Sequence, residues 1–467
     1  MRRLHRFALL AALITAAVPA ATARAATQMP IGFFDDVSFR FSPDAQANLA
    51  AAASTGASVI HTTANWATIA PTRPKNAANA ADPAYRLGDL DALVDGAGRY
   101  GLRVMINVTG APKWANGGKT PNYLPKKTAD FATFVRMLAT RYNGHNGHTG
   151  VALWSIWNEP NLQQFLMPQY GGTAKKPTIV SPANYAKILK VAYAAIKKAN
   201  PLAKVAAGET SAQGRDKPAK KASQTVSPGT FARLLAKVKG VKFDAWAHHP
   251  YPTAPGAKPL EKVRYPNVTL STLPKFEKDL RTWFHRTVPV WITEYGHETK
   301  PAEKKGVTYA QQSAYAKQAL GIARKDPNVQ MFVWFTFRDS SGNPWQSGLE
   351  QASGAHKPSF AAFSALARLI DGTLTTVKAG GTPKVTMFVP TIGFNVPAGS
   401  ALGLTYHVYE GTREIAIGQA APTLAADGSI TFFPDFTPAK KVTYRVVADV
   451  NDVNGVTETR TSSVVGS

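Results

Sequence analysis

The chain has 467 residues, of which 44% are hydrophobic and 18% are charged. This composition excludes a mainly disordered protein, and the length favours a large barrel or sandwich joined to a second module. The absence of cysteine excludes a disulfide scaffold, a thiol nucleophile and a cysteine-ligated metal. The formal net charge of +25 would suit a nucleic-acid partner, but no nucleic-acid-binding motif accompanies it, so we expect none.

The first 25 residues have the pattern of an export signal. Arg2 and Arg3 give a basic start, the segment 7–18 is apolar, and Ala23-Arg24-Ala25 fits a cleavage site. No later segment reaches the ~20 uninterrupted apolar residues that span a bilayer, so we expect no membrane insertion. The pattern predicts a mature protein that is secreted, extracellular or attached to the cell wall.

Short apolar runs alternate with amphipathic stretches eight times between residues 31 and 370. Serine-proline pairs at Ser181 and Ser227 each predict the start of a helix in one of the amphipathic stretches. Eight such units predict a (β/α)8 TIM barrel over residues 26–375, and an open doubly wound sheet is disfavoured because no glycine-rich phosphate loop follows the first run. The expected strands are Ile31–Phe34, Ser58–Trp66, Leu102–Val108, Val151–Trp157, Lys204–Ala207, Phe243–His248, Val288–Thr293 and Val329–Phe335.

The composition and the hydrophobic pattern of the sequence change after the last of these units. A stretch rich in glycine and threonine leads into short alternating runs such as Val385–Val389, Leu402–Tyr409, Ile430–Phe433 and Val442–Val447. Seven basic and seven acidic residues balance beyond residue 375, so the positive charge belongs to the larger N-terminal part. Residues 376–467 are therefore expected to form a small all-β sandwich.

Two glutamates follow strands of the predicted barrel. Asn158-Glu159-Pro160 ends the fourth strand, and Thr293-Glu294-Tyr295 ends the seventh. Residues just beyond a strand face the mouth of such a barrel, and strands four and seven stand nearly opposite each other. One glutamate alone fits a solvated loop residue or a partner for a lysine. The pair gives the two-carboxylate arrangement that cleavage of a glycosidic bond requires.

The Asn-Glu-Pro and Thr-Glu-Tyr-Gly segments resemble those of the retaining glycoside hydrolases of clan A, especially families 39 and 5. The resemblance covers residues 31 to about 370 and is diffuse outside the strand ends. It implies that Glu159 is the general acid/base, that Glu294 is the nucleophile, and that Asn158 donates to the substrate 2-hydroxyl.

The sixth strand supplies His248-His249-Pro250-Tyr251. His249 and Tyr251 match the H-x-Y pattern of the family, which implies that both belong to the substrate site and that Tyr251 hydrogen-bonds the nucleophile. A tyrosine hydroxyl that donates to a carboxylate stabilises its charged form. The adjacent histidines should point to opposite faces of the strand, so they cannot readily bind one metal ion. We expect no metal and no organic cofactor.

Tryptophans near strand ends are candidates for stacking on a sugar ring. Trp334 on the eighth strand is expected to act so from the family resemblance, whereas Trp114 could equally be a core residue. Residues 59–66 resemble the second strand of the family, and this places His61 and Trp66 in the substrate site. His61 stands where the family commonly has an arginine, so a permanent cation is replaced by one that can lose its charge.

These observations predict an exported, monomeric, retaining glycoside hydrolase that cleaves O-glycosidic bonds of a poly- or oligosaccharide by double displacement. A transglycosylase would use the same residues, and a catalytically silent carbohydrate-binding surface protein is the alternative from another class. Basic residues in the loops after strands four to seven favour an anionic substrate, unless the whole domain is simply basic.

Overall fold

The structure is a computed structural model that describes residues 29–219, 222–342, 345–370, 374–389, 392–393, 396–425, 428–455 and 457–467. The expected export signal, residues 1–25, lies outside the described residues.

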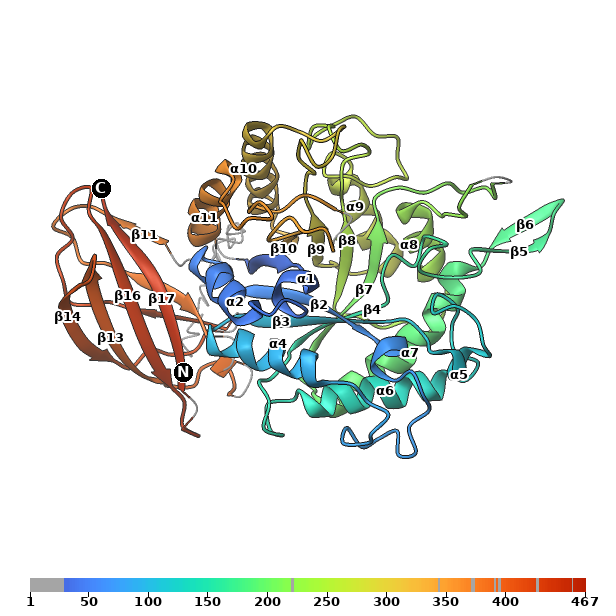
Figure 1. Ribbon diagram of the computed structural model, residues 1–467, viewed down its shortest axis with the longest axis horizontal. Coiled ribbons are helices and arrows are strands. Elements are labelled where there is room, and N and C mark those ends of the chain that lie inside the picture. The colour runs from blue at the N-terminus through green and yellow to red at the C-terminus, as the bar shows by residue number, and fades with distance from the viewer. Residues whose placement is uncertain are drawn as a thin grey trace, which may run out of the picture.

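A closed parallel barrel forms the larger part of the molecule, as the sequence predicted (Figure 1). Its strands pair in the order β1-β2-β3-β4-β7-β8-β9-β10 and back to β1. Each expected strand is present with ends shifted by only a few residues. The strands are β1 (Ile31–Phe34), β2 (Val59–Asn65), β3 (Arg103–Thr109), β4 (Leu153–Ile156), β7 (Lys204–Ser211), β8 (Ala245–His249), β9 (Val290–Tyr295) and β10 (Val329–Trp334).

Helices surround the barrel and cover its outer face (Figure 1). Proline in the first turn starts two of them after Ser181 and Ser227, and a capping box between Thr308 and Gln311 starts a third. The helices are α1 (Asp36–Phe39), α2 (Ala45–Ser54), α3 (Trp66–Ile69), α4 (Gly88–Arg99), α5 (Lys113–Asn116), α6 (Thr128–Arg141), α7 (Ser181–Ala199), α8 (Pro228–Ala236), α9 (Leu273–Phe284), α10 (Tyr309–Lys325) and α11 (Pro358–Ile370).

Apolar side chains fill the inside of the barrel. Alternate residues of a strand face inward, and the apolar ones form one buried cluster that includes Val59, Met105, Ala247, Trp291 and Val333. The intervening residues face the helices and belong to the larger core. The barrel interior is therefore packed, and any site must lie above this layer at the carboxyl ends of the strands.

A β-hairpin interrupts the alternation after β4. Strands β5 (Tyr170–Thr173) and β6 (Lys176–Ile179) pair with each other and project away from the barrel (Figure 1). The sequence analysis did not predict this hairpin.

The C-terminal part is all-β, as expected, and lies beside α2, α4 and α11 (Figure 1). A five-stranded sheet in the order β11-β17-β16-β13-β14 and a two-stranded sheet β12-β15 enclose a separate apolar core. The five-stranded sheet already begins just before the expected boundary at residue 376. The strands are β11 (Leu374–Val377), β12 (Val385–Phe388), β13 (Gly403–Glu410), β14 (Arg413–Ala420), β15 (Ser429–Phe432), β16 (Thr443–Asn451) and β17 (Thr457–Gly466).

Contacts join the two parts. The Arg460 guanidinium of β17 donates to the backbone oxygen of Gly101, and the Arg103 guanidinium lies 4.3 Å from the ring centre of Phe388. Within the described part of the chain, no helix combines the length and the apolar character needed to cross a membrane.

Candidate active site

A layer of polar side chains lies above the apolar interior of the barrel. All but one of its members lie two residues after an inward-facing apolar residue of their strand, so the alternation that builds the core also delivers polar groups to the mouth. Glu209 is the exception, because it lies three residues after Ala206 where the pairing of its strand is irregular. The layer consists of His61 on β2, Asn107 on β3, Ser155 on β4, Glu209 on β7, His249 on β8 and Thr293 on β9, and every one is buried.

Glu159 follows β4 at a sharp turn. Trp157 and Glu159 both have positive φ angles, 67° and 35°, in a region that residues with a Cβ rarely adopt. The turn is held from below, because the Asn107 amide donates to the Trp157 backbone oxygen at 2.6 Å and the Trp157 indole donates to the Phe165 backbone oxygen at 2.6 Å. These contacts fix Glu159 at the carboxyl end of the barrel.

Glu294 lies on β9, inside the mouth, and its side chain is largely buried. The Tyr251 hydroxyl donates to Glu294 Oε2 at 3.1 Å, which confirms the hydrogen bond expected between these residues.

His249 connects the carboxylates of the site. Its Nδ1 lies 3.0 Å from Glu159 Oε1 and 3.6 Å from Glu294 Oε2, and its Nε2 lies 2.7 Å from Glu209 Oε2. The ring is fully buried, so His249 is not a residue that touches substrate, contrary to the expectation. Its ring nitrogens contact the three glutamates instead.

The close carboxylates perturb one another. Burial raises the pKa of Glu294 to about 7; the charges of Glu159 and Glu209 add to this rise, while the His249 cation and the Tyr251 hydrogen bond oppose it. Burial would lower the pKa of His249, but the charges of Glu294, Glu159 and Glu209 hold it well above its usual range. Such opposed shifts in one cleft are typical of acid/base sites.

A cleft of about 440 Å³ opens above these residues, with both Glu159 and Glu294 in its wall. A neighbouring cavity of about 480 Å³ shares Gln164 and Phe165 with it and contains Asn158. Asn158 therefore lines a cavity that adjoins the cleft with the two glutamates.

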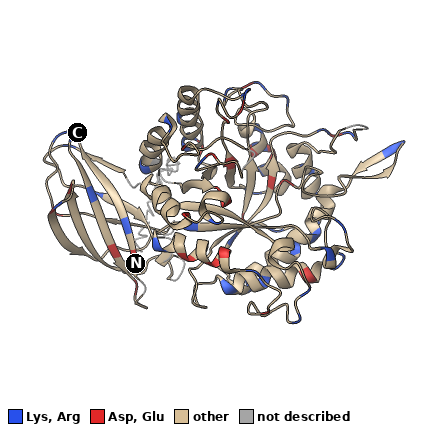
Figure 2. Ribbon diagram, in the orientation of Figure 1, with Lys and Arg blue, Asp and Glu red and all other residues tan. Residues whose placement is uncertain are grey.

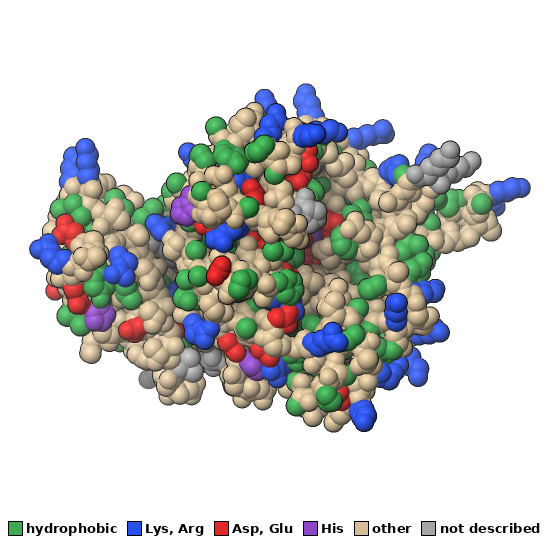
Figure 3. Space-filling view, viewed as in Figure 1, with side chains coloured by type: hydrophobic (Ala, Val, Ile, Leu, Met, Phe, Trp, Pro, Cys, Tyr) green, Lys and Arg blue, Asp and Glu red, His purple; other side chains and the backbone are tan. Residues whose placement is uncertain are grey.

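The cleft wall carries acidic and aromatic side chains but, among the described residues that line it, no lysine or arginine. Glu298 is its third acid, and Tyr251, Phe335 and Trp345 supply aromatic surface. Lysine and arginine side chains instead project from the outer edge of this face, including the β5–β6 hairpin (Figure 3). Figure 2 shows the same distribution along the ribbon.

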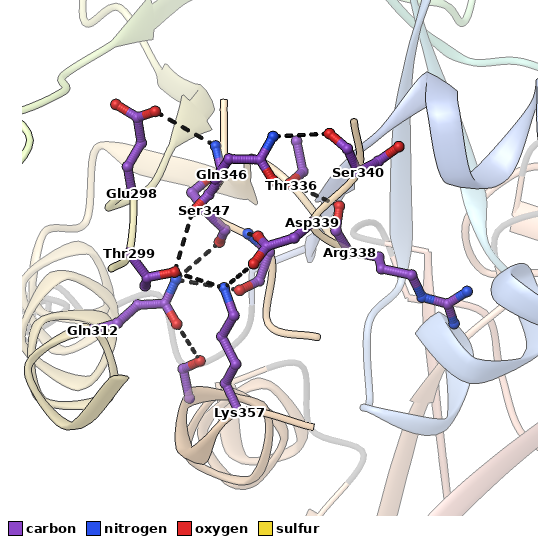
Figure 4. A network of polar contacts seen from close by, with 12 residues as sticks. Glu298, Thr299, Gln312, Thr336, Arg338, Asp339, Ser340, Gln346, Ser347 and Lys357 are labelled. Atoms are coloured by element: carbon purple, nitrogen blue, oxygen red, sulfur yellow. Dashed lines mark hydrogen bonds and ion pairs between the residues drawn. The ribbon is translucent and has the colours of Figure 1, made fainter. Parts of the chain in front are cut away.

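A polar network that includes Gln346, Ser347 and Lys357 anchors the loop after β10, to which Trp345 belongs (Figure 4). The buried Lys357 ammonium contacts Asp339 Oδ2 at 2.6 Å and Thr299 Oγ1 at 2.9 Å. The Gln312 amide donates to the backbone oxygens of His297, Ser347 and Gly348. These contacts tie the loop after β10 to the loop after β9, so the position of Trp345 is set by the fold.

Trp334 is not the sugar platform that we expected. It is fully buried, its indole donates to the Ser347 backbone oxygen at 2.9 Å, and its ring packs near Tyr295 and Phe363. The reason is strand parity: Val333 faces into the barrel, so Trp334 faces the helices. Trp345, which sequence reasoning missed, is the tryptophan that lines the cleft.

Trp66 and Trp114 do not line the cleft or the neighbouring cavity, contrary to the expectation that they belong to the substrate site. Trp66 is 1% exposed and stacks on Phe134 in the core. Trp114 is partly exposed, but it lines neither cavity; its indole donates to the Ala70 backbone oxygen at 2.8 Å and the Arg73 guanidinium covers its ring at 4.4 Å.

His61 does not reach the cleft either. It is 1% exposed and its Nδ1 donates to the Thr293 backbone oxygen at 3.1 Å, beneath the mouth. Burial lowers the pKa of His61, although the nearby Glu209 opposes this. The position therefore carries a neutral ring and does not supply the cation of the resembled family.

Glu209 is a further residue that sequence reasoning did not identify. The signal was available, because Gly208-Glu209-Thr210 ends a strand of the barrel, as the other two glutamates do. Among the described residues, no three His, Asp or Glu side chains are arranged to hold a metal ion.

Comparison with known proteins identifies this architecture. A sequence model of the family described as "Cellulase (glycosyl hydrolase family 5)" matches residues 25–336, more than half of the chain. A search of curated proteins finds no match.

Solved structures share the fold at low sequence identity. A family 39 glycoside hydrolase from Bacteroides cellulosilyticus WH2 is 18% identical, with a TM-score of 0.53 over 88% of this chain and 80% of that one. A glucosidase from Croceicoccus marinus is 11% identical, with a TM-score of 0.55 over 91% and 96%. GH5_18 from Streptomyces cattleya, solved with GlcNAc, is 17% identical, with a TM-score of 0.50 over 76% and 85%. The resemblance to clan A is confirmed.

Proposed function

Because the chain belongs to glycosyl hydrolase family 5 and is a glycoside hydrolase, we propose that it cleaves O-glycosidic bonds of a poly- or oligosaccharide with retention of anomeric configuration. Glu294 is the nucleophile and Glu159 the general acid/base in this proposal. Glu209, the acid of the polar layer, is fully buried and does not line the cleft, so it is neither.

The observation that carries the proposal is the contact of one nitrogen with both carboxylates. His249 Nδ1 lies 3.0 Å from Glu159 Oε1 and 3.6 Å from Glu294 Oε2. The two oxygens can be no farther apart than these distances added together, which disfavours the ~6.5–9.5 Å gap between carboxyl groups of inverting enzymes. Retaining enzymes hold them ~5–5.5 Å apart.

In the first step, Glu294 attacks the anomeric carbon while Glu159 donates its proton to the departing glycosidic oxygen. The bond from carbon to the leaving oxygen breaks as the bond to the Glu294 oxygen forms. In the second step, Glu159 takes a proton from water, and the resulting attack releases the sugar and regenerates the Glu294 carboxylate. A sugar hydroxyl can replace water in this step, which gives transglycosylation at the same site.

The variants Glu159→Gln and Glu294→Gln test these roles. Each should lower turnover of a natural glycoside by about 10²–10⁴-fold. An aryl glycoside with an acidic phenol should partly rescue the first step of Glu159→Gln, because its leaving group needs no proton, but it should not rescue Glu294→Gln. Near wild-type turnover of a natural glycoside by either variant would contradict its assigned role.

An anionic polysaccharide is the substrate class that we propose from the charged rim. Lys175 and Lys176 are exposed on the β5–β6 hairpin, and Arg215 and Lys217 are exposed on the loop after β7 (Figure 2). The Tyr170 hydroxyl joins the two, because it lies within hydrogen-bonding distance of the backbone oxygens of both Arg215 and Thr225 and can donate to either.

One acid, Asp216, lies among these basic residues. It is exposed, and its carboxylate accepts hydrogen bonds from Ser227 and Thr230 at the start of α8. The same loop continues from Ser211 and Gln213 in the cleft wall, so the basic group adjoins the cleft. We infer that it attracts acidic groups of a polymer whose uncharged units occupy the cleft.

A charge-matched pair of variants tests this. Replacing Lys175, Lys176, Arg215 and Lys217 by Gln should raise KM for an acidic polysaccharide about tenfold at low salt, a difference that shrinks as salt increases. KM for a neutral polysaccharide should not change. The control replaces Lys187, Lys198, Lys317 and Lys325, exposed on α7 and α10. An equal effect of the control set would show that only total charge matters.

We also propose export, on the basic, apolar and small-residue pattern of residues 1–25. N-terminal sequencing of protein recovered from the medium should show cleavage after Ala25. Recovery of intact protein from the cytosol alone would contradict export.

A further inference from the structure

Two consecutive histidines on β8 have contrasting partners. His248 faces the helices; its Nε2 lies 2.9 Å from the Val268 backbone oxygen, and its Nδ1 lies 2.9 Å from the Thr210 hydroxyl. A carbonyl can only accept, so Nε2 donates, and Nδ1 accepts from the hydroxyl. A neutral ring satisfies both partners of His248.

His249 faces the interior and meets carboxylates on both sides. Nε2 lies 2.7 Å from Glu209 Oε2, and Nδ1 lies 3.0 Å from Glu159 Oε1. Ionised carboxylates only accept, so both ring nitrogens must carry hydrogen for both contacts to be hydrogen bonds. Glu294 Oε2 also faces Nδ1, at 3.6 Å.

Glu209 is built into the wall behind this ring. The pairing of β7 with β8 shifts register between Gly208 and Thr210, and Glu209 has a φ of 47° in that irregular turn. The Thr293 hydroxyl donates to the same oxygen that contacts His249, at 2.7 Å. The side chain is fully buried and absent from the cleft wall, so it can act on substrate only through other residues.

We propose that Glu209 is a positioning residue whose buried carboxylate keeps His249 protonated at both ring nitrogens, so that Nδ1–H holds Glu159 and Glu294 in register across the cleft. The proposal rests on the roles assigned to Glu159 and Glu294 above. The ion pair supplies the positive charge that a neutral His61 does not.

A competing arrangement has a neutral His249, with Nε2–H donating to Glu209 and a protonated Glu159 donating to Nδ1. In that arrangement the Nδ1 lone pair also faces Glu294 Oε2. A proton on His249 Nδ1 lies near the carboxylates of both Glu159 and Glu294, whereas a proton on Glu159 neutralises only the Glu159 carboxylate. Electrostatics therefore favour the cation.

The other ionisable groups around His249 and Glu209 do not replace the negative charge of Glu209. Burial lowers the pKa of His61 and brings that of His248 to about 3, so both are neutral, and burial raises the pKa of Tyr251 and Tyr185, so neither phenol ionises. Burial raises the pKa of Glu209, but the hydrogen bond from His249 is the largest of the opposing effects, and the pKa falls to about 2. The groups that face the pair are His61 from β2, Glu159 after β4, Tyr185 from α7, His248 on β8, Tyr251 after β8 and Glu294 on β9.

Kinetics of Glu209→Gln test the proposal. The amide keeps the shape but removes the charge, so His249 loses its proton more easily and both cleft carboxylates lose a neighbouring cation. We expect kcat to fall about 10–100-fold with KM within about threefold, and the acidic limb of the pH profile to rise by about 1–2 pH units. Glu209→Asp keeps the charge, so it should retain most of kcat and the wild-type position of the acidic limb. Glu277→Gln, a buried glutamate on α9, is the control and should leave both unchanged.

The imidazole ¹⁵N signals of His249, assigned with His249→Gln, give a readout that does not require turnover. At pH 7 the wild type should show two protonated nitrogens, and Glu209→Gln one. A neutral His249 in the wild type would overturn the proposal, and this holds even if Glu209→Gln fails to fold. An unchanged pH limb in Glu209→Gln would reduce Glu209 to a structural residue. If Glu294→Gln is inactive and His249 of the wild type is an imidazolium, both proposals are supported. If Glu294→Gln is fully active and His249 of the wild type is an imidazolium, only the assignment of Glu294 as nucleophile is wrong.

Discussion

The Tyr251 hydroxyl donates to Glu294 Oε2 at 3.1 Å, from a ring that is itself held between Tyr295 and Trp345. Tyr251 N also donates to the His249 backbone oxygen at 2.8 Å, so the tight turn after β8 carries both residues that contact the Glu294 carboxylate. One short segment thus sets the orientation and the charge of the proposed nucleophile.

Tyr251→Phe should make Glu294 a weaker nucleophile while the aromatic ring stays in the cleft wall. The hydrogen bond from Tyr251 lowers the pKa of Glu294, so its removal raises that pKa and shifts the acidic limb of kcat/KM to higher pH. We expect kcat to fall about 10–100-fold, about 1.4–2.7 kcal/mol. Measurement of kcat/KM against pH checks both effects, and an unchanged profile would show that the hydroxyl does not act on Glu294.

The acidic limb of the wild-type profile should lie near pH 7. Burial raises the pKa of Glu294 to about 7, and the charges of Glu159 and Glu209 add to this rise. Only the ionised carboxylate can attack the anomeric carbon, so the nucleophile is lost as the pH falls below about 7. Below that pH, kcat/KM for a natural glycoside should fall about tenfold per pH unit.

An aryl glycoside with a good leaving group serves as the control for this limb, because its departure needs little protonation but still needs the ionised nucleophile. Its first step should show the same decline below pH 7. Activity on both substrates that stays constant from pH 7 to pH 5 would contradict the raised pKa of Glu294.

Trp345 and Trp334 make a matched pair of substitutions. Trp345→Ala removes aromatic surface from the cleft and should raise KM about tenfold with little change in stability. Trp334→Ala empties a fully buried site and should lower the free energy of unfolding by about 3–5 kcal/mol. Substrate kinetics and urea unfolding of both variants separate the two roles, and the reverse pattern would restore Trp334 as the sugar platform.

Glu277 gives a test of electrostatics away from the site. Burial, with the charge of Asp326, raises its pKa to about 8. Its proton is bound more tightly in the folded state, so the fold loses stability as the pH rises from the unfolded pKa near 4.5 toward 8. Glu277→Gln should raise the free energy of unfolding by about 1–3 kcal/mol at pH 8 and change it little at pH 4.

Glu350 is the control for this effect. It is equally buried but pairs with Arg338 at 2.7 Å, so Glu350→Gln should destabilise the protein at pH 8. Equal shifts in both variants, measured by urea unfolding at the two pH values, would contradict the account.

The positions of Glu159, Glu294 and Tyr251 could be predicted because strand ends are encoded locally. Apolar runs mark the strands, and the barrel places whatever follows them at one mouth. Trp334 could not be assigned in this way, since its role depends on whether it or Val333 faces inward, and a shift of one residue reverses that.

Glu209 and Trp345 depend on features that the local pattern does not encode. The inward direction of Glu209 comes from two consecutive residues with positive φ, Gly208 and Glu209, in an irregular strand pairing. Trp345 belongs to a long loop whose position is set by the buried Lys357–Asp339 contact, which joins residues distant from it. The β5–β6 hairpin has short strands with glycine, lysine and proline, which gave no alternation to recognise.

Trapping of the glycosyl-enzyme intermediate is the most direct test of the central claim. A 2-deoxy-2-fluoro glycoside with a dinitrophenyl leaving group, of the sugar that the enzyme accepts, slows the second step and allows the intermediate to accumulate. Proteolysis and mass spectrometry should then locate the sugar on Glu294, and Glu294→Gln should remain unlabelled. A label on Glu159 or Glu209, or no label together with a product of inverted configuration, would contradict the account.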